Sequence, residues 1–276
     1  MTLDGFIAPG IPTPVFWMFI GAAVLIQGIS KSGFAGGAGI LALPLALLVM
    51  PVDKVAATML PLLILCDMNA IYHHRRNREW RHIRALYGPA AIGIVLGAIV
   101  WWWVGREGIS HYGIWLKRFV GIVAVVFAFY IFCKERALSW IQRFTPGRGM
   151  TWLAGLTAGF SSTIAHAAGP IVSLYMYTFG MEKSLFVGTV AWTFTLINLT
   201  KLPFYVSVGL VKTDVLVFDL FLIPLIPIGS FLGKWMHHRV SESLFNRVLL
   251  VLVLLTAVQL ISDFNVIHWV LAQFFG

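Results

Sequence analysis

Six stretches of this chain are apolar enough, over enough residues, to form helices that cross a lipid bilayer. A spanning helix needs about 20 predominantly apolar residues, and the six candidates are 55–72, 84–104, 117–133, 185–207, 215–234 and 244–262. The chain is 59% hydrophobic and 11% charged, whereas soluble domains carry about a quarter charged residues. Too few polar residues remain to coat a soluble protein, so the sequence predicts a single all-α, multi-pass transmembrane domain over residues 1–276.

Two further apolar stretches, 15–50 and 150–179, are interrupted by small and polar residues and are not expected to form single helices. The first break reads GISKSGFAGGAG over 28–39, and the second reads GFSSTIAHAAGP over 159–170. Each broken stretch is followed by three long helices. Related residues recur at nearly constant spacing: Gly39 with Gly169, Asp67 with Asn198, and 92–97 with 228–233. This plan predicts an internal duplication, with repeats at 15–134 and 150–262.

The distribution of basic residues predicts the orientation of these helices. The loop 73–84 holds five arginines and is expected to be cytoplasmic. Following the helices from there leaves 13 Lys and Arg inside, five outside and two buried, Lys31 and Lys201. The two broken stretches then become re-entrant hairpins that enter from opposite faces, so the repeats have inverted topology. Residues 263–276 are expected to lie along the outer interface, and the net charge of +9 reflects topology rather than nucleic-acid binding.

The two breaks are the candidate binding site. Non-helical backbone at membrane depth is tolerated where it lines a cavity, and free N–H groups at helix ends attract anions. We therefore predict an oxyanion site between the two tips, formed by Lys31, Ser32, Gly33, Gly36, Gly37, Gly39, Ser161, Ser162, Thr163, His166, Gly169 and Lys201. The alternative is that the breaks are glycine-rich helix contacts with incidental hydroxyl groups.

Ionisable residues within the spans suggest roles in coupling, because such residues are costly in a bilayer. Asp67 and His166 are the candidate ion-coupling residues. Asp67 could instead pair with an arginine of the next loop, Lys201 could reach toward the interface, and His166 could be a packed hydrogen-bonding residue. Neither a metal-ligand spacing nor a cofactor motif occurs, so no metal or cofactor is expected.

The two breaks, at Gly28–Pro44 and Gly155–Tyr175, resemble those of the TauE/SafE family of sulfite exporters. The duplicated plan and the basic loop after the first long helix are also similar. The resemblance implies a transporter of small inorganic or organosulfur anions such as sulfite, sulfoacetate or thiosulfate. It does not by itself select one of them.

The predicted function is therefore export of a small sulfur-containing oxyanion, sulfite first, by alternating access across a bacterial cytoplasmic membrane. An anion channel is the alternative within the same class. An intramembrane enzyme is disfavoured, because the chain has neither an HExxH motif nor a Ser/His/Asp arrangement. The expected partners are the anion and the lipid bilayer, and a homo-oligomer is compatible with these features.

Overall fold

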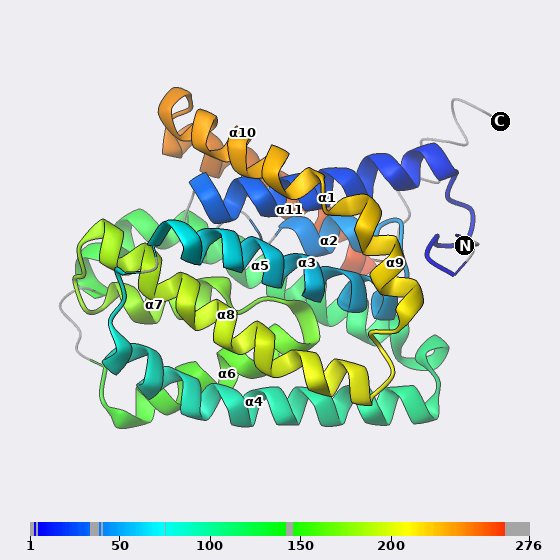
Figure 1. Ribbon diagram of the computed structural model, residues 1–276, viewed down its shortest axis with the longest axis horizontal. Helices are drawn as coiled ribbons and strands as arrows, with labels where there is room; N and C mark the ends of the chain where they lie inside the picture. The colour runs from blue at the N-terminus through cyan, green and yellow to red at the C-terminus, as the bar shows by residue number, and fades with distance from the viewer. Residues whose placement is uncertain are drawn as a thin grey trace.

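The computed structural model describes residues 3, 5–33, 39, 41–74, 76–141 and 146–262. All the long elements within these ranges are α-helices, packed side by side along one axis of the molecule (Figure 1). In chain order they are α1 (Thr13–Gly33), α2 (Ala42–Leu47), α3 (Val52–His74), α4 (Trp80–Glu107), α5 (Ile109–Ile141), α6 (Arg148–Ala165), α7 (Gly169–Tyr177), α8 (Lys183–Ser207), α9 (Thr213–Leu222), α10 (Leu225–Arg239) and α11 (Glu242–Ser262). The predicted all-α fold with several apolar spans is confirmed.

Five of the six predicted spans lie within single helices: α3, α4, α5, α8 and α11. The sixth prediction, a single helix over 215–234, is wrong, because the chain forms α9 and α10 with a bend of 43° between them. Pro224 lies at the bend. Proline lacks the N–H that would continue the helix, and its ring clashes with the carbonyl four residues earlier.

Both broken stretches form two successive helices, as the sequence predicts, but residues 28–33 and 159–165 of the predicted breaks belong to α1 and α6, and residues 34–38 lie outside the described residues. In each stretch, the start of the first helix also lies close to the end of the second helix. Before α1, the N–H of Ala8 donates to the carbonyl of Val49, which follows α2, at 2.8 Å. The hydroxyl groups of Thr151, in the first turn of α6, and Tyr175, near the end of α7, are 3.2 Å apart. Figure 1 shows that α1 and α6 start from opposite ends of the molecule.

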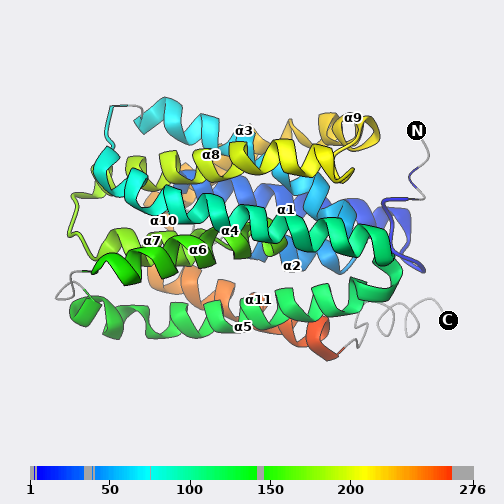
Figure 2. The same cartoon turned by 90° about the horizontal axis from the view of Figure 1, so that it is seen from below.

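Each of the main helix pairs in the packing has a counterpart when α1, α3, α4 and α5 are replaced by α6, α8, α10 and α11, and the reverse. Helix α1 packs along α10, and α6 packs along α4; α3 packs on α8, and α5 packs on α11. Figure 2 shows α5 beside α11 and α3 beside α8. Helix α1 has the length and hydropathy of a complete span, although it belongs to a broken stretch. Re-entry and inverted topology depend on where a bilayer lies, and they stay predictions.

Glycines let α4 approach α6 closely, and they let α10 approach α1 closely. A Cβ at Gly97 of α4 would lie 2.6 Å from Cβ of Thr163 on α6. At the corresponding crossing, a Cβ at Gly233 of α10 would lie 2.6 Å from the hydroxyl of Ser32 on α1. Small residues permit such close helix crossings in membranes. The tips of both breaks are therefore held by the same kind of contact.

The end of α3 and the start of α4, which flank the arginine-rich loop, lie at one end of the molecule with the end of α5, the start of α6, and the α7–α8 and α10–α11 connections (Figure 1). The start of α1 lies toward the other end. This grouping agrees with the sides that the basic residues predict for these loops.

Cysteine accessibility tests this topology. After Cys66 and Cys133 are replaced, single cysteines at partly exposed Asp53, next to the first residue of α3, and at exposed Glu182 are expected to react with a membrane-impermeant thiol reagent from opposite sides of the membrane. The reason is that Val52 begins α3 at one end of the molecule and Glu182 precedes α8 at the other (Figure 1). Labelling of both positions from the same side would contradict the inverted arrangement.

Candidate functional site

Each tip carries three consecutive polar residues that play matching parts. They are Ser30-Lys31-Ser32 at the end of α1 and Ser161-Ser162-Thr163 at the end of α6. The first residue of each set closes its break. Ser30 accepts a hydrogen bond from the N–H of Gly39 at 2.7 Å, and the Ser161 hydroxyl reaches the carbonyl of Ala167 at 3.4 Å.

The third residue of each tip serves helix packing. The Ser32 hydroxyl is 2.8 Å from the Gly28 carbonyl and 3.0 Å from the Ser230 carbonyl, both of which accept. The Thr163 hydroxyl donates to the Gly159 carbonyl at 2.9 Å. Both hydroxyls donate to backbone carbonyls. The structure therefore does not bring these two predicted binding residues into the group of polar side chains around Lys31, Asp67 and Lys201.

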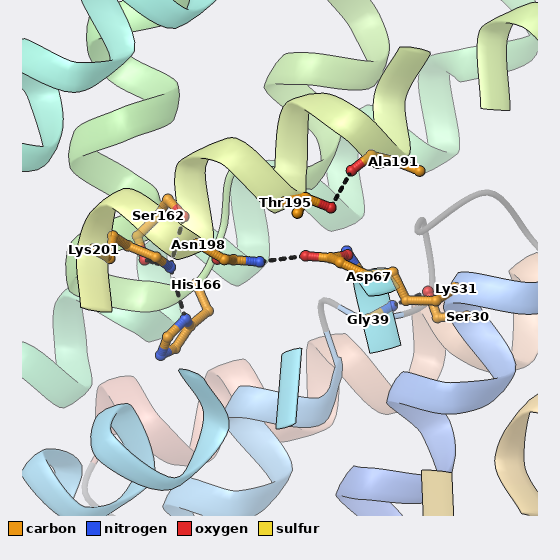
Figure 3. Close-up of polar contacts among 10 residues, drawn as sticks. All are labelled: Ser30, Lys31, Gly39, Asp67, Ser162, His166, Ala191, Thr195, Asn198 and Lys201. Carbon is orange, nitrogen blue, oxygen red and sulfur yellow. Dashed lines mark hydrogen bonds and ion pairs between the residues drawn. The ribbon is translucent and has the colours of Figure 1, made fainter. Parts of the chain in front are cut away.

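The middle residue of the first tip joins a buried ion pair. Lys31 Nζ lies 2.5 Å from Asp67 Oδ1, and the Asp67 side chain is completely buried. The other carboxylate oxygen accepts from Asn198 Nδ2 at 2.6 Å, which connects α3 to α8 (Figure 3). The Lys31 ammonium also lies 4.1 Å from the centre of the Phe194 ring, a cation–π contact. Asp67 therefore pairs with Lys31 rather than with an arginine of the loop.

The middle residue of the second tip holds the other buried lysine. Lys201 of α8 has no exposed surface, so its side chain does not reach the interface. Its Nζ donates to the hydroxyl of Ser162 at 3.0 Å and to the carbonyl of the same residue at 3.1 Å. A third contact, at 3.1 Å, is to Nδ1 of His166 (Figure 3).

His166 is fixed by the backbone as well as by its neighbours. It follows α6 in the left-handed region, with φ of 48°, and it is the one non-glycine residue with positive φ among the described residues. Such a conformation is costly and occurs often at functional sites. Its Nε2 lies 3.0 Å from the carbonyl of Ala56, which can only accept, so Nε2 carries the proton and Nδ1 accepts from Lys201.

The carbonyl of Thr163 shows how the end of α6 is held in place. It accepts from the indole N–H of Trp101 at 2.9 Å and from the hydroxyl of Tyr205 at 2.5 Å. Both donors are buried and come from α4 and α8. Bonds of this kind satisfy carbonyls that the end of a helix leaves without a partner. The sequence gives no sign of this contact.

A small pocket lies between the two breaks. The first break contributes Gly39 with the start of α2, the second contributes Ala165, His166 and Ala167, and α5 forms the third wall. The pocket has room for roughly one water molecule. An oxyanion with several heavy atoms needs the tips to move apart.

The other predicted residues lie near this centre or outside the described part. Gly33 ends α1, and Gly169 is the first residue of α7. Gly39 packs against Gln27, whose side-chain oxygen would lie 2.5 Å from a Cβ at that position. Gly36 and Gly37 lie outside the described residues, as does the segment 263–276 that is predicted to be interfacial.

Sequence reasoning missed two residues. Asn198 was matched to Asp67 as a duplicated position, but that correspondence did not indicate that the two side chains meet. Asp219 was overlooked altogether, although an acid inside the apolar stretch 215–234 is itself a signal. Asp219 is buried in α9 and lies on a different helix from the network of Lys31, Asp67 and Lys201.

The polar centre, formed by Lys31, Asp67, Ser162, His166, Asn198 and Lys201, holds more basic than acidic side chains. Among the described residues it contains two lysines, Lys31 and Lys201, and one carboxylate, Asp67, while the hydrogen bonds given above leave His166 neutral. Buried charges are normally paired, and an unbalanced cation marks a place where an anion is favoured. The arrangement is suited to binding an anion.

Comparison with known proteins gives one match. The family model described as "Sulfite exporter TauE/SafE" matches residues 19–260. Searches of curated proteins and of solved structures find no match. The matched region includes both breaks, all of α3 to α10 and every residue of the polar centre. The chain, a multi-pass helical membrane protein, belongs to the sulfite exporter TauE/SafE family, whose members are membrane transporters of sulfur-containing anions.

Proposed function

We propose that the protein is a secondary transporter that exports sulfite from the cytoplasm across a bacterial inner membrane. The observation that carries this proposal is the pair of lysines beside the two tips, Lys201 fully buried and Lys31 12% exposed. Lys31 lies at the first tip and pairs with Asp67, and Lys201 of α8 donates to Ser162 of the second tip; among the described residues of this centre, Asp67 is the one carboxylate. An anion that enters between the tips supplies the missing negative charge.

The way in which the tips are held supports alternating access as the mechanism of this transport. Each tip belongs to a hairpin that starts from a different end of the molecule (Figure 1), and the packing order of the helices is unchanged when the halves are exchanged. These features support two repeats of inverted topology, a plan found in many secondary transporters. The narrow pocket between the tips supports a carrier that closes around its substrate rather than an open channel.

Flux into proteoliposomes tests the proposal. Purified protein is expected to give saturable uptake of sulfite into vesicles, with competition by sulfoacetate and thiosulfate measured in the same assay. Sulfate and chloride serve as comparison anions. Flux that rises linearly with concentration would indicate a channel, and the absence of flux for every sulfur anion would reject the proposal.

The Ser162→Ala variant is expected to bind the transported anion about tenfold more weakly. The hydroxyl of Ser162 holds Lys201 at the second tip, and a hydrogen bond to a charged group contributes about 1.5–3 kcal/mol. Thr157→Ala is the matched control, because Thr157 lies on the same helix and its exposed hydroxyl bonds only to backbone carbonyls of α6. The half-saturating anion concentration measures the effect, and an unchanged value in Ser162→Ala would remove this tip from the site.

Protonation at His166 or Asp67 is the proposed means of coupling. A proton on Nδ1 of His166 would end its hydrogen bond with Lys201 and bring two cations together. A proton on Asp67 would end its ion pair with Lys31. Either event raises the charge of the site by one and favours the anion.

Flux with voltage and pH gradient set independently tests this coupling. A negative interior drives a monoanion outward by about 2.3 kcal/mol per 100 mV, so voltage alone can support export. We expect the wild type to respond to both gradients and His166→Gln to lose the response to pH. Unchanged pH dependence in both His166→Gln and Asp67→Asn would contradict the role of these groups.

A further inference from the structure

The side chain of Asp219 on α9 is buried and has no partner. It is 2% exposed, and neither carboxyl oxygen has a hydrogen-bond partner within the part of the chain that the structure describes. More than nine in ten buried polar groups in proteins are paired, so an exception requires an explanation. The proposed anion site and its coupling groups, His166 and Asp67, do not include Asp219.

The surroundings of Asp219 are apolar. The other buried residues of α9 are Val215, Phe218 and Leu222. The ring of Phe218 stacks on Phe6 at 4.5 Å and on Trp17 at 5.6 Å, which places this face of α9 against α1 and the segment before it. Helix α9 also packs against α3. The carboxyl group therefore lies within the main apolar core rather than facing water.

The charged groups on the neighbouring helices are occupied elsewhere. On α3, Lys54 pairs with Asp214 at 2.8 Å, and Asp67 pairs with Lys31 of α1. Other titratable groups on the adjoining elements include partly exposed Asp53, exposed Lys212 and Tyr205, whose hydroxyl donates to Thr163, and, farther along α3, buried Cys66 and exposed Tyr72. Among the described residues, none of these groups forms a hydrogen bond with Asp219. None of these described groups balances a negative charge on Asp219.

An ionised carboxylate in this position would be an isolated buried charge, which proteins avoid by taking up a proton or a cation. A metal cation needs several oxygen ligands. Among the described residues no group of three or more His, Cys, Asp and Glu side chains could hold a metal ion. A proton needs only the carboxyl group itself.

We propose that Asp219 is a proton-binding site of this protein, separate from the anion site. Its carboxyl group is protonated while α9 is packed against α1 and α3 as in this structure, and it releases the proton when that packing opens to water. The position of Asp219 suits a helix that moves during transport. Helix α9 ends at the 43° bend near Pro224, and α10 beyond the bend packs along α1, which carries Lys31.

This connection predicts that proton release accompanies movement of the first tip. The chain of contacts is Asp219 on α9, the bend, α10, and then α1 with Lys31 at its end. The coupling part of the inference rests on the transport function proposed above. The protonation part does not, and the two are tested separately.

Carbodiimide labelling and stability test protonation. Dicyclohexylcarbodiimide is a lipid-soluble reagent that forms a stable adduct with protonated carboxyl groups in apolar surroundings. Mass spectrometry is expected to find the adduct at Asp219 and not at Asp214, and to find less of it as pH rises. Asp219→Asn, a neutral residue of the same shape, is expected to abolish the adduct and to keep thermal stability constant as pH rises, while the wild type loses stability. The matched Asp214→Asn variant is expected to lose thermal stability with rising pH in the same way as the wild type.

The same variants test coupling through flux. Asp219→Asn is expected to transport under a membrane potential but to lose stimulation by a pH gradient, and Asp214→Asn is expected to keep it. Stimulation retained in Asp219→Asn would overturn the coupling. A stability difference between Asp219→Asn and the wild type that has the same size at every pH would overturn the protonation, because it would mean that folding does not change how tightly Asp219 binds its proton. If the wild type carries no sulfur anion at all, the proposed function fails, and the labelling and stability results still decide the proton site.

Discussion

The Asp67→Asn variant is expected to be less stable than the wild type by about 3 kcal/mol, because removing one partner of a buried ion pair leaves the other charge uncompensated. Asp67 is fully buried, and its two oxygens bind Lys31 and Asn198. The asparagine can keep only one acceptor oxygen for these two donors. Thermal unfolding in detergent, followed with a thiol-reactive or tryptophan fluorescence signal, measures the loss.

Two further variants show whether the ion pair is responsible. The double variant Lys31→Gln with Asp67→Asn removes both charges and is expected to recover much of the lost stability, while anion flux stays low. Asp214→Asn breaks the exposed pair with Lys54 and is expected to change stability by less than about 1 kcal/mol. Equal losses of stability in Asp67→Asn and Asp214→Asn would contradict the conclusion that the Asp67 ion pair is buried and the Asp214 pair is exposed.

The Gly159→Ala variant is expected to lose about 3 kcal/mol or more, and accumulation of folded protein in the membrane should fall with it. A Cβ at Gly159 of α6 would overlap the carbonyl of Ala90 on α4. Overpacking costs typically 1–3 kcal/mol, and here a helix backbone rather than a flexible side chain must move. The tip of the second hairpin lies at the end of the same helix, so transport is expected to fall as well.

Gly88→Ala is the matched control for this crossing. Gly88 is on α4, and a Cβ there would have nothing within 4 Å. Because alanine is the better helix former, the control is expected to be neutral or slightly stabilising. The yield of monodisperse protein and its unfolding temperature are compared across both variants. A Gly159→Ala protein as stable as Gly88→Ala would show that α4 and α6 are not in close contact.

The helices could be predicted from the sequence because a bilayer requires long apolar runs with internally satisfied backbone. Most spans and both breaks follow from this requirement alone. The bend between α9 and α10 was missed because hydropathy does not respond to one proline in an apolar run. Pro224 offered a signal, but Pro61, Pro89 and Pro203 lie inside continuous helices, so proline does not identify a bend by itself.

The segments that form the candidate site could be predicted from the sequence, but the bonds between their side chains could not. Glycine and hydroxyl residues at membrane depth mark the tips, and the buried lysines are rare enough to be noticed. The partners depend on how α3 and α8 are rotated against each other, which no local pattern contains. The pairing of Lys31 with Asp67, and the contrast between Ser162 facing Lys201 and Thr163 facing its own helix, therefore required the structure.

The hydrogen bond between Asp67 and Asn198 limits how alike the two halves can be. These residues occupy positions that the sequence predicts to be duplicated, and Asn198 Nδ2 lies 2.6 Å from Asp67 Oδ2. If both were aspartate, two carboxylates would face each other and would have to share a proton. If both were asparagine, Lys31 would lose its counter-charge. A protein made by giving the two halves the same residue at these positions would therefore be disfavoured at this pair.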